Sequence, residues 1–126
     1  MFLEVVILFV KKLFCGIIFL MISIETLRRY CKEDTIFITN HARERCRERG
    51  ITVRDILNAV MTGEVIEDYP DDFPFPTCLL LGKSEKGSII HLCMSDEGES
   101  SKLITAYYPD LEKWENDLKT RKGASK

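Results

Sequence analysis

The five cysteines of this sequence include no CxxC pair, and their number is odd. A disulfide framework and a zinc ribbon both need paired cysteines at regular spacings, so the sequence argues against both classes. Unpaired thiols of this kind fit a reducing compartment, and we expect a cytoplasmic protein. We also expect no metal and no other cofactor.

A long hydrophobic run is also lacking. Residues 1–24 are strongly apolar, but Glu4 and the pair Lys11-Lys12 divide them. A spanning helix needs roughly twenty uninterrupted residues, so no stable membrane span is expected. A signal peptide is disfavoured because no small-residue cleavage site precedes Glu25. Residues 1–22 are therefore interpreted as an apolar extension, either a helix that lies on the domain or on a membrane surface, or a segment before a translation start at Met21.

The 126 residues suffice for one domain, and their formal net charge is only -2. The charge is unevenly distributed. Residues 39–54 carry five arginines against two glutamates, whereas residues 64–117 carry four lysines against thirteen acidic residues. A basic helix on an acidic body favours a local anion site; the alternative is a solvated helix face. The acidic body opposes extended nucleic-acid binding, so only a short substrate is compatible.

Helical spacing and capping residues predict three helices in the first half of the chain. Residues 24–31 have apolar positions at helical spacing. The second helix begins after Thr39 or Asn40 and ends at Gly50. Thr52 and Asp55 form a capping box for the third helix, which Gly63 ends. The last two helices are predicted to form a hairpin.

Alternating apolar residues then predict four strands, at residues 65–69, 78–81, 89–94 and 103–108. In the third of these, Ile90, Leu92 and Met94 share one face and His91 lies on the other. Asp110 is predicted to cap a final helix, in which Leu111, Trp114 and Leu118 share a face. Residues 121–126 form a basic tail.

These elements predict the α+β fold class. An N-terminal helical hairpin packs on a four-stranded, mainly antiparallel sheet, and a short C-terminal helix follows, within a single domain at residues 23–120.

Six ordered blocks also resemble the prokaryotic family called domain of unknown function 4258. They are HARER (41–45), RGI (49–51), GEVIEDYP (63–70), LG (81–82), HL (91–92) and ITAYYPD (104–110), followed by Trp114. The resemblance spans roughly residues 22–120. Cys46 stands where the family often has methionine, and residues 1–20 lie outside the pattern. The family is similar in layout to the metal-independent ribonuclease toxins of the RelE and BrnT type, which implies a RelE- or barnase-like fold.

The candidate site residues are His41, Arg45, Arg49, His91 and Tyr107. On a helix, residues four apart advance by about 40° around the axis, so the first three form one stripe along the second helix. Histidine can donate or accept a proton near neutral pH, and arginine can hold phosphate oxygens. His91 joins His41 only if the helices cover its face of the sheet; otherwise the two lie apart. Tyr107 is a candidate acid or substrate-orienting group.

Each of these residues also has a structural interpretation. The arginines can pair with Glu64, Glu67 or Asp68, and His41 can anchor the start of its helix. The leading functional hypothesis is a small toxin-like protein that binds RNA and cleaves it without metal. The alternatives are a module that binds a basic or antitoxin-like protein, or an inactive relative of such toxins. The sequence leaves the oligomeric state open.

Overall fold

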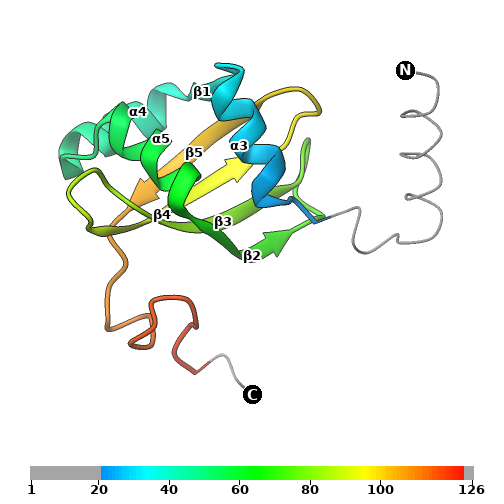
Figure 1. Cartoon of the computed structure of the whole chain (residues 1–126). Coiled ribbons are helices and arrows are strands. Elements are labelled where there is room, and N and C mark those ends of the chain that lie inside the picture. Colours follow the sequence, from blue (N-terminus) through cyan, green and yellow to red (C-terminus); the bar gives the residue numbers. More distant parts are fainter. Residues whose placement is uncertain (1–20, 124–126) are drawn as a thin grey trace.

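The computed structural model describes residues 21–123 (Figure 1). The expectations for residues 1–20, including their membrane or domain contact, and for residues 124–126 lie outside the described residues. The elements run in the order α3 (Ile24–Lys32), β1 (Ile36–Ile38), α4 (Asn40–Arg49), α5 (Val53–Thr62), β2 (Glu64–Tyr69), β3 (Thr77–Lys83), β4 (Ile89–Ser95) and β5 (Ser101–Tyr107). The α+β class is confirmed.

The sheet has five strands in the order β1-β5-β4-β3-β2. Strands β2 to β5 form the predicted antiparallel meander. The prediction of four strands was wrong, because β1 adds a parallel edge strand beside β5. A strand of three residues between two helices is too short to show an alternating pattern, which is why the sequence did not reveal it.

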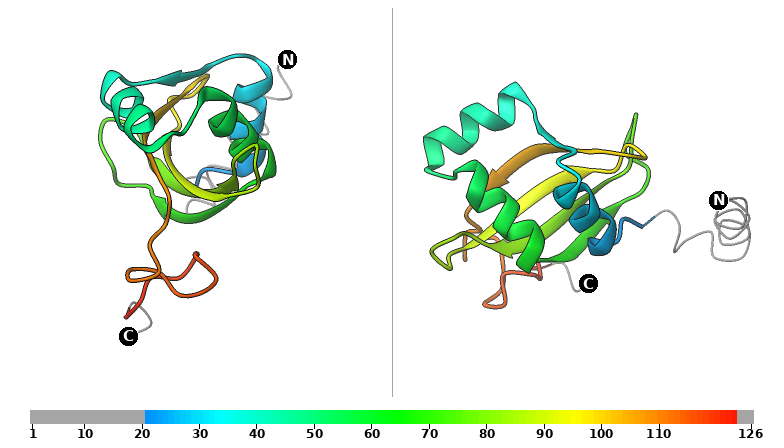
Figure 2. Two further views of the ribbon diagram at one scale, coloured as in Figure 1. Left: turned by 90° about the vertical axis from the view of Figure 1, so that its left-hand side faces the viewer. Right: turned by 45° about the horizontal axis from the view of Figure 1, so that its top comes forward.

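The three helices of residues 21–123 lie on one face of the sheet, as Figure 2 shows from two sides. Helix α4 lies over β5, and α5 lies over β3 and packs against α3. The helix predicted at residues 24–31 is confirmed as α3. The N-terminal hairpin was wrong in two respects: β1 lies between α3 and the pair, and α5 packs against α3 more than against α4. The buried face of β4, made by Ile90, Leu92 and Met94, forms the centre of the core with residues of the helices.

The predicted helix ends are confirmed. The Thr39 hydroxyl accepts from the backbone N–H of Ala42, and Gly50 ends α4 with a φ of 69°. Thr52 and Asp55 form the expected capping box at the start of α5. The capping box occupies backbone donors that would otherwise have no partner within the helix. The positions of α4 and α5 are thus fixed at the short connection between them.

Helix α5 approaches the sheet closely at Gly82 of β3. A Cβ atom on Gly82 would lie 2.2 Å from the carbonyl oxygen of Ala59 in α5. No side chain fits in that space, so glycine is required for the helix to reach the sheet at this point.

The chain after β5 is not helical. Residues 108–123 form turns that cross the face of the sheet opposite the helices, below the sheet in Figure 1. We call residues 109–123 the C-terminal segment. The predicted final helix was wrong, because Leu111 is exposed while Trp114 is buried, so the two do not share a buried stripe. Leu118 even has a positive φ of 59°.

Across residues 21–123, none of the helices combines the length and the apolar character that a membrane crossing requires.

Candidate functional site

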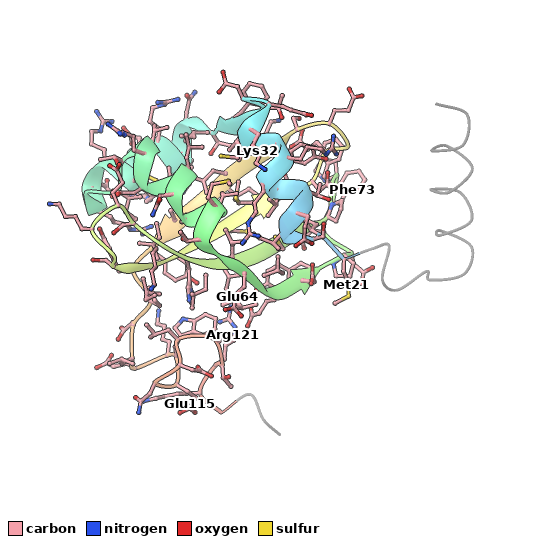
Figure 3. The ribbon with its side chains drawn as sticks, viewed as in Figure 1. Met21, Lys32, Glu64, Phe73, Glu115 and Arg121 are labelled. Carbon is pink, nitrogen blue, oxygen red and sulfur yellow. The ribbon has the colours of Figure 1, made fainter. Side chains whose placement is uncertain are left out.

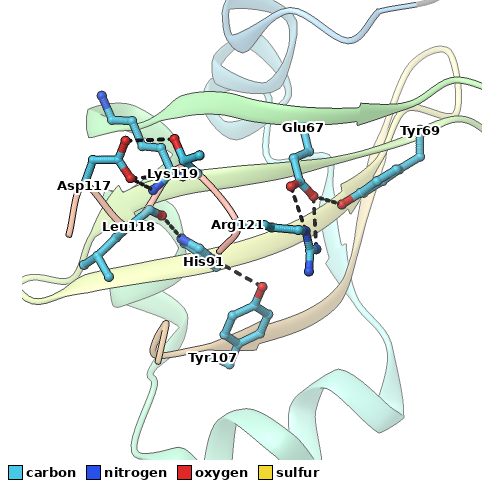
Figure 4. Close-up of polar contacts among 9 residues, drawn as sticks. Glu67, Tyr69, His91, Tyr107, Asp117, Leu118, Lys119 and Arg121 are labelled. Atoms are coloured by element: carbon cyan, nitrogen blue, oxygen red, sulfur yellow. Dashed lines mark hydrogen bonds and ion pairs between the residues drawn. The ribbon is translucent and has the colours of Figure 1, made fainter. Parts of the chain in front are cut away.

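His91 lies at the centre of the sheet face that the helices do not cover, as the alternation of β4 predicts. It is completely buried beneath the C-terminal segment (Figure 4). Its Nε2 lies 2.7 Å from the carbonyl oxygen of Leu118, and its Nδ1 lies 3.2 Å from the Tyr107 hydroxyl. Its ring meets the rings of Tyr107 and Trp114 edge to face, with centroid separations of 5.2 and 4.6 Å.

These contacts define the protonation state of His91. A carbonyl oxygen only accepts, so Nε2 carries the proton and donates to Leu118. Burial lowers the pKa of His91 and outweighs the hydrogen bond to Leu118, which acts in the opposite direction. The ring is therefore neutral near pH 7, and its Nδ1 accepts from the Tyr107 hydroxyl. With both nitrogens occupied, His91 holds the C-terminal segment on the sheet.

Tyr107 has a different position from His91, because it reaches the surface. Burial raises the pKa of Tyr107, so its hydroxyl keeps its proton near neutral pH. A protonated hydroxyl can donate a hydrogen bond or a proton but cannot act as a base.

The stripe on α4 does not meet His91. His41 is exposed at the start of the helix, and α4 packs on the opposite face of the sheet. Arg45 pairs with Glu48, with Nη1 and Oε1 2.8 Å apart. Eight residues at about 1.5 Å each separate His41 from Arg49 by roughly 12 Å along the axis. The two histidines thus lie apart, because α4 covers one face of the sheet and the His91 side chain points to the other.

Arg49 is the one member of the stripe that reaches the end of β5. Its Nη1 donates to the carbonyl oxygen of Ala106 at 2.6 Å. Strand β1 ends opposite Leu103, so this carbonyl lies beyond the end of β1. A guanidinium has five N–H donors, and the bond to Ala106 uses one of them. Arg49 is therefore fixed in place with most of its donors still able to bind a ligand.

Arg49 and Tyr107 line the same groove, with a volume of about 550 Å³, between α4, the end of β5 and the C-terminal segment. Three cationic and three aromatic side chains surround it, together with one carboxylate. They are Arg49, Lys113 and Arg121; Tyr107, Tyr108 and Trp114; and Asp110. We call this site the basic-aromatic groove. Its volume lies within the range of pockets that bind small ligands.

The C-terminal segment is held by an ion pair at the far side of the groove. Arg121 donates from Nε and Nη2 to the two carboxylate oxygens of Glu67 in β2, at 2.8 and 3.1 Å (Figure 4). The Tyr69 hydroxyl donates to the same carboxylate. Burial alone would raise the pKa of Glu67, but the bonds from Arg121 and Tyr69 outweigh it and lower the pKa. The guanidinium also lies over the Trp114 ring, 4.6 Å from its centroid.

The acidic partners expected for Arg45 and Arg49 are used by the C-terminal segment instead. Glu67 binds Arg121, and Glu64 binds Lys119 with Oε2 and Nζ 3.0 Å apart. Because Glu67 neutralises Arg121, the remaining charges of the groove are the cations Arg49 and Lys113 and the carboxylate Asp110.

The sequence alone suggested Arg49 and Tyr107 but not the other groove residues. Tyr108, Asp110, Lys113, Trp114 and Arg121 all follow β5 within a short stretch. The run Tyr107-Tyr108-Pro109-Asp110 resembles a family block, but that resemblance gives Tyr108 and Asp110 no role. Residues 107–121 contain three aromatic and three basic residues but also four acidic ones, in no regular order, so the sequence offers no periodic signal for the groove.

The four described cysteines provide no activated thiol. Burial raises the pKa of Cys31, Cys46, Cys78 and Cys93, so these thiols stay protonated. Within residues 21–123 there is also no group of three histidine, cysteine or acidic residues arranged to hold a metal ion.

A sequence model described as "Domain of unknown function (DUF4258)" matches residues 38–108. The match covers more than half of the chain, so the chain belongs to this family. It includes α4, α5 and strands β2 to β5, and ends at Tyr108 in the groove. The comparisons with curated proteins and with solved structures gave no match.

Proposed function

We propose that this member of the family binds a short single-stranded RNA in the basic-aromatic groove. The observation that carries the proposal is the combination of cations and aromatic rings around one opening. Aromatic side chains stack on bases whatever their sequence, and arginine and lysine contact phosphates.

The arrangement assigns roles within the groove. Arg49, fixed by the Ala106 carbonyl, and Lys113 contact a phosphate, and the half-exposed Tyr108 ring stacks on a base. Arg45 and His41 lie further along α4, where the next phosphates of a short strand would pass. The acidic residues elsewhere on the protein repel a longer strand, which limits the substrate to a few nucleotides.

We further propose that the protein cleaves the bound RNA without a metal ion. Asp110 takes the proton of the ribose 2′-hydroxyl, whose oxygen attacks the adjacent phosphorus. The Tyr107 hydroxyl turns from His91 Nδ1 toward the substrate and donates its proton to the 5′-oxygen as the bond from phosphorus to that oxygen breaks. Arg49 and Lys113 stabilise the additional negative charge at phosphorus. The products are a 2′,3′-cyclic phosphate and a free 5′-hydroxyl. In this scheme His91 is a positioning residue, because its contact with the Tyr107 hydroxyl holds the Tyr107 side chain beside the groove.

Binding is tested with a short, fluorescently labelled single-stranded RNA of mixed sequence and anisotropy measurements at low salt. We expect Arg49→Ala and Lys113→Ala each to raise Kd by about tenfold, which corresponds to about 1.4 kcal/mol. The matched control is Arg47→Ala, which removes the same charge from an exposed arginine of α4 that pairs with Glu44. Equal effects of Arg47→Ala and Arg49→Ala would mean that the groove is not the binding site.

Cleavage is tested separately with total RNA in the presence of a chelator. We expect Tyr107→Phe to abolish the 2′,3′-cyclic product while RNA binding persists. RNA that binds but is never cut by the wild-type protein would reject the ribonuclease and leave the binding proposal standing.

A further inference from the structure

The end of the sheet farthest from the basic-aromatic groove carries an exposed apolar surface. Phe73, in the loop between β2 and β3, is 94% exposed, and Figure 3 labels it at that end of the molecule. Phe75 and Ile104 lie beside it, each more than one-third exposed, and all three line one groove of about 210 Å³. Phe37 of β1 is 54% exposed and lies opposite Lys102, which also lines this groove.

We call these four side chains the apolar patch. Single exposed hydrophobic residues are common, but three phenylalanines and an isoleucine together mark an interaction site. The fold does not need Phe73 there, since the side chain is almost fully exposed to solvent.

The two loops around the patch are strongly acidic. Residues 70–76 and 96–100 contain five carboxylates and no lysine or arginine. These are Asp71, Asp72, Asp96, Glu97 and Glu99. Glu97 pairs with Lys102, 3.7 Å away, and Asp96 accepts from the Tyr30 hydroxyl. Among the described residues, no cationic side chain lies within ion-pair distance of Asp71 or Glu99.

We infer that the apolar patch binds a cationic amphipathic peptide segment of a partner protein. The apolar side chains of such a segment cover Phe73, Phe75, Ile104 and Phe37, and its lysines or arginines face the two acidic loops. Aromatic anchors surrounded by polar residues are typical of peptide-binding surfaces.

The charge of the loops argues against the other occupants. In a symmetric dimer the same surface meets itself, so Asp71 and Glu99 of one copy would face those of the other and repel them. An anionic membrane surface and RNA are repelled for the same reason. The inference is independent of the proposed RNA site, which lies at the other end of β5.

The test uses the full chain and a synthetic Leu/Lys helical peptide with one apolar and one basic face. Two control peptides separate the contributions: a Leu/Glu peptide reverses the charge, and a Ser/Lys peptide removes the apolar face. Calorimetry measures Kd for each. We expect only the Leu/Lys peptide to bind, with a Kd in the micromolar range, and added salt to weaken it.

Matched variants locate the binding surface. Phe73→Ser should raise Kd by about tenfold or more, and Asp71→Asn should raise it and reduce the salt dependence. Met61→Ser is the control, because Met61 is also exposed but lies on α5. Circular dichroism confirms that each variant is folded, which is expected because Phe73 and Met61 are exposed.

Three results of the binding measurements would overturn the inference. These are absence of binding to the Leu/Lys peptide, an equal Kd for the wild type and Phe73→Ser, and equal binding of the Leu/Glu peptide. Sedimentation that shows a dimer lost in Phe73→Ser would also overturn it, because a second copy would then be the occupant.

Discussion

The ring of His91 meets the ring of Trp114 nearly at right angles, with centroids 4.6 Å apart. His91 is at the centre of the sheet and Trp114 is in the C-terminal segment, which otherwise has no regular secondary structure. Together with the bond from His91 to Leu118, this contact explains why an irregular segment stays on the sheet and supplies one wall of the basic-aromatic groove.

We expect His91→Ala to lower the free energy of unfolding by about 3 kcal/mol. The change removes a buried ring and leaves the Leu118 carbonyl without its donor. Urea unfolding measures the difference. His41→Ala is the control and should change stability by no more than about 0.5 kcal/mol, because His41 is exposed. Similar losses in the two variants would contradict the structural role of His91.

The pKa of His91 predicts a pH dependence of stability. Burial lowers this pKa from its usual value of 6.5, so the unfolded chain takes up a proton at a higher pH than the folded chain. The stabilisation is complete above pH 6.5 and is lost as the pH falls through the folded-state pKa. Thermal melts between about pH 8 and pH 5.5 should show a falling Tm below pH 6.5. This pH range lies above the usual pKa of Glu67, 4.5, so the Glu67 carboxyl does not contribute to the change in Tm.

The variant that checks this assignment is His91→Gln, which cannot titrate. Its Tm should be lower than that of the wild type at pH 8. Between pH 8 and pH 5.5 its Tm should fall less than that of the wild type. A pH dependence as steep as that of the wild type would assign the effect to another group.

Arg121→Ala should release the C-terminal segment without unfolding the domain. The variant removes both hydrogen bonds to Glu67 and the contact with Trp114. Because the pair is partly exposed, we expect a loss of only about 1 kcal/mol in global stability. Limited trypsin digestion should nevertheless cut after Lys113 or Lys119 faster than in the wild type. The control is Lys122→Ala, which removes a neighbouring exposed charge. Equal cleavage of both variants would show that Arg121 does not hold the segment.

Gly82→Ala should destabilise the protein by about 3 kcal/mol or prevent folding. Its Cβ would meet backbone atoms of Ala59, which cannot rotate away as a side chain could. Gly98→Ala is the comparison. Gly98 has a positive φ of 99° but open space around it, so only conformational strain of about 1 kcal/mol is expected. Urea unfolding of both proteins separates steric contact from backbone strain.

The sequence is sufficient to predict those parts of the fold that depend on interactions between neighbouring residues. The capping box at Thr52 and the alternation around His91 need only neighbouring residues, and both are confirmed. Strand β1 and the C-terminal segment depend on distant partners. The spacing of Leu111, Trp114 and Leu118 fits a helix, but contact with His91 overrides that local preference.

The same distinction applies to the candidate site. The angular position of Arg49 on α4 follows from the sequence, but its bond to Ala106 joins two elements far apart in the chain. The sequence predicts that His41 and His91 lie apart only if the helices cover the Ile90 face of β4. The contributions of Lys113 and Arg121 depend on how the irregular segment folds back, which no periodic pattern reveals.

The parallel pairing of β1 with β5 has a consequence for synthesis. Ile36 pairs with Ser101, so β1 cannot complete its ladder until nearly the whole domain has left the ribosome. Until then, β1 and α4 lack the strand that both contact, and the partly made sheet lacks one edge. Such non-local closure slows folding and lengthens the exposure of unpaired strand edges. We therefore expect nascent chains that end before β5 to depend on chaperones, and those that end after the C-terminal segment to fold unaided.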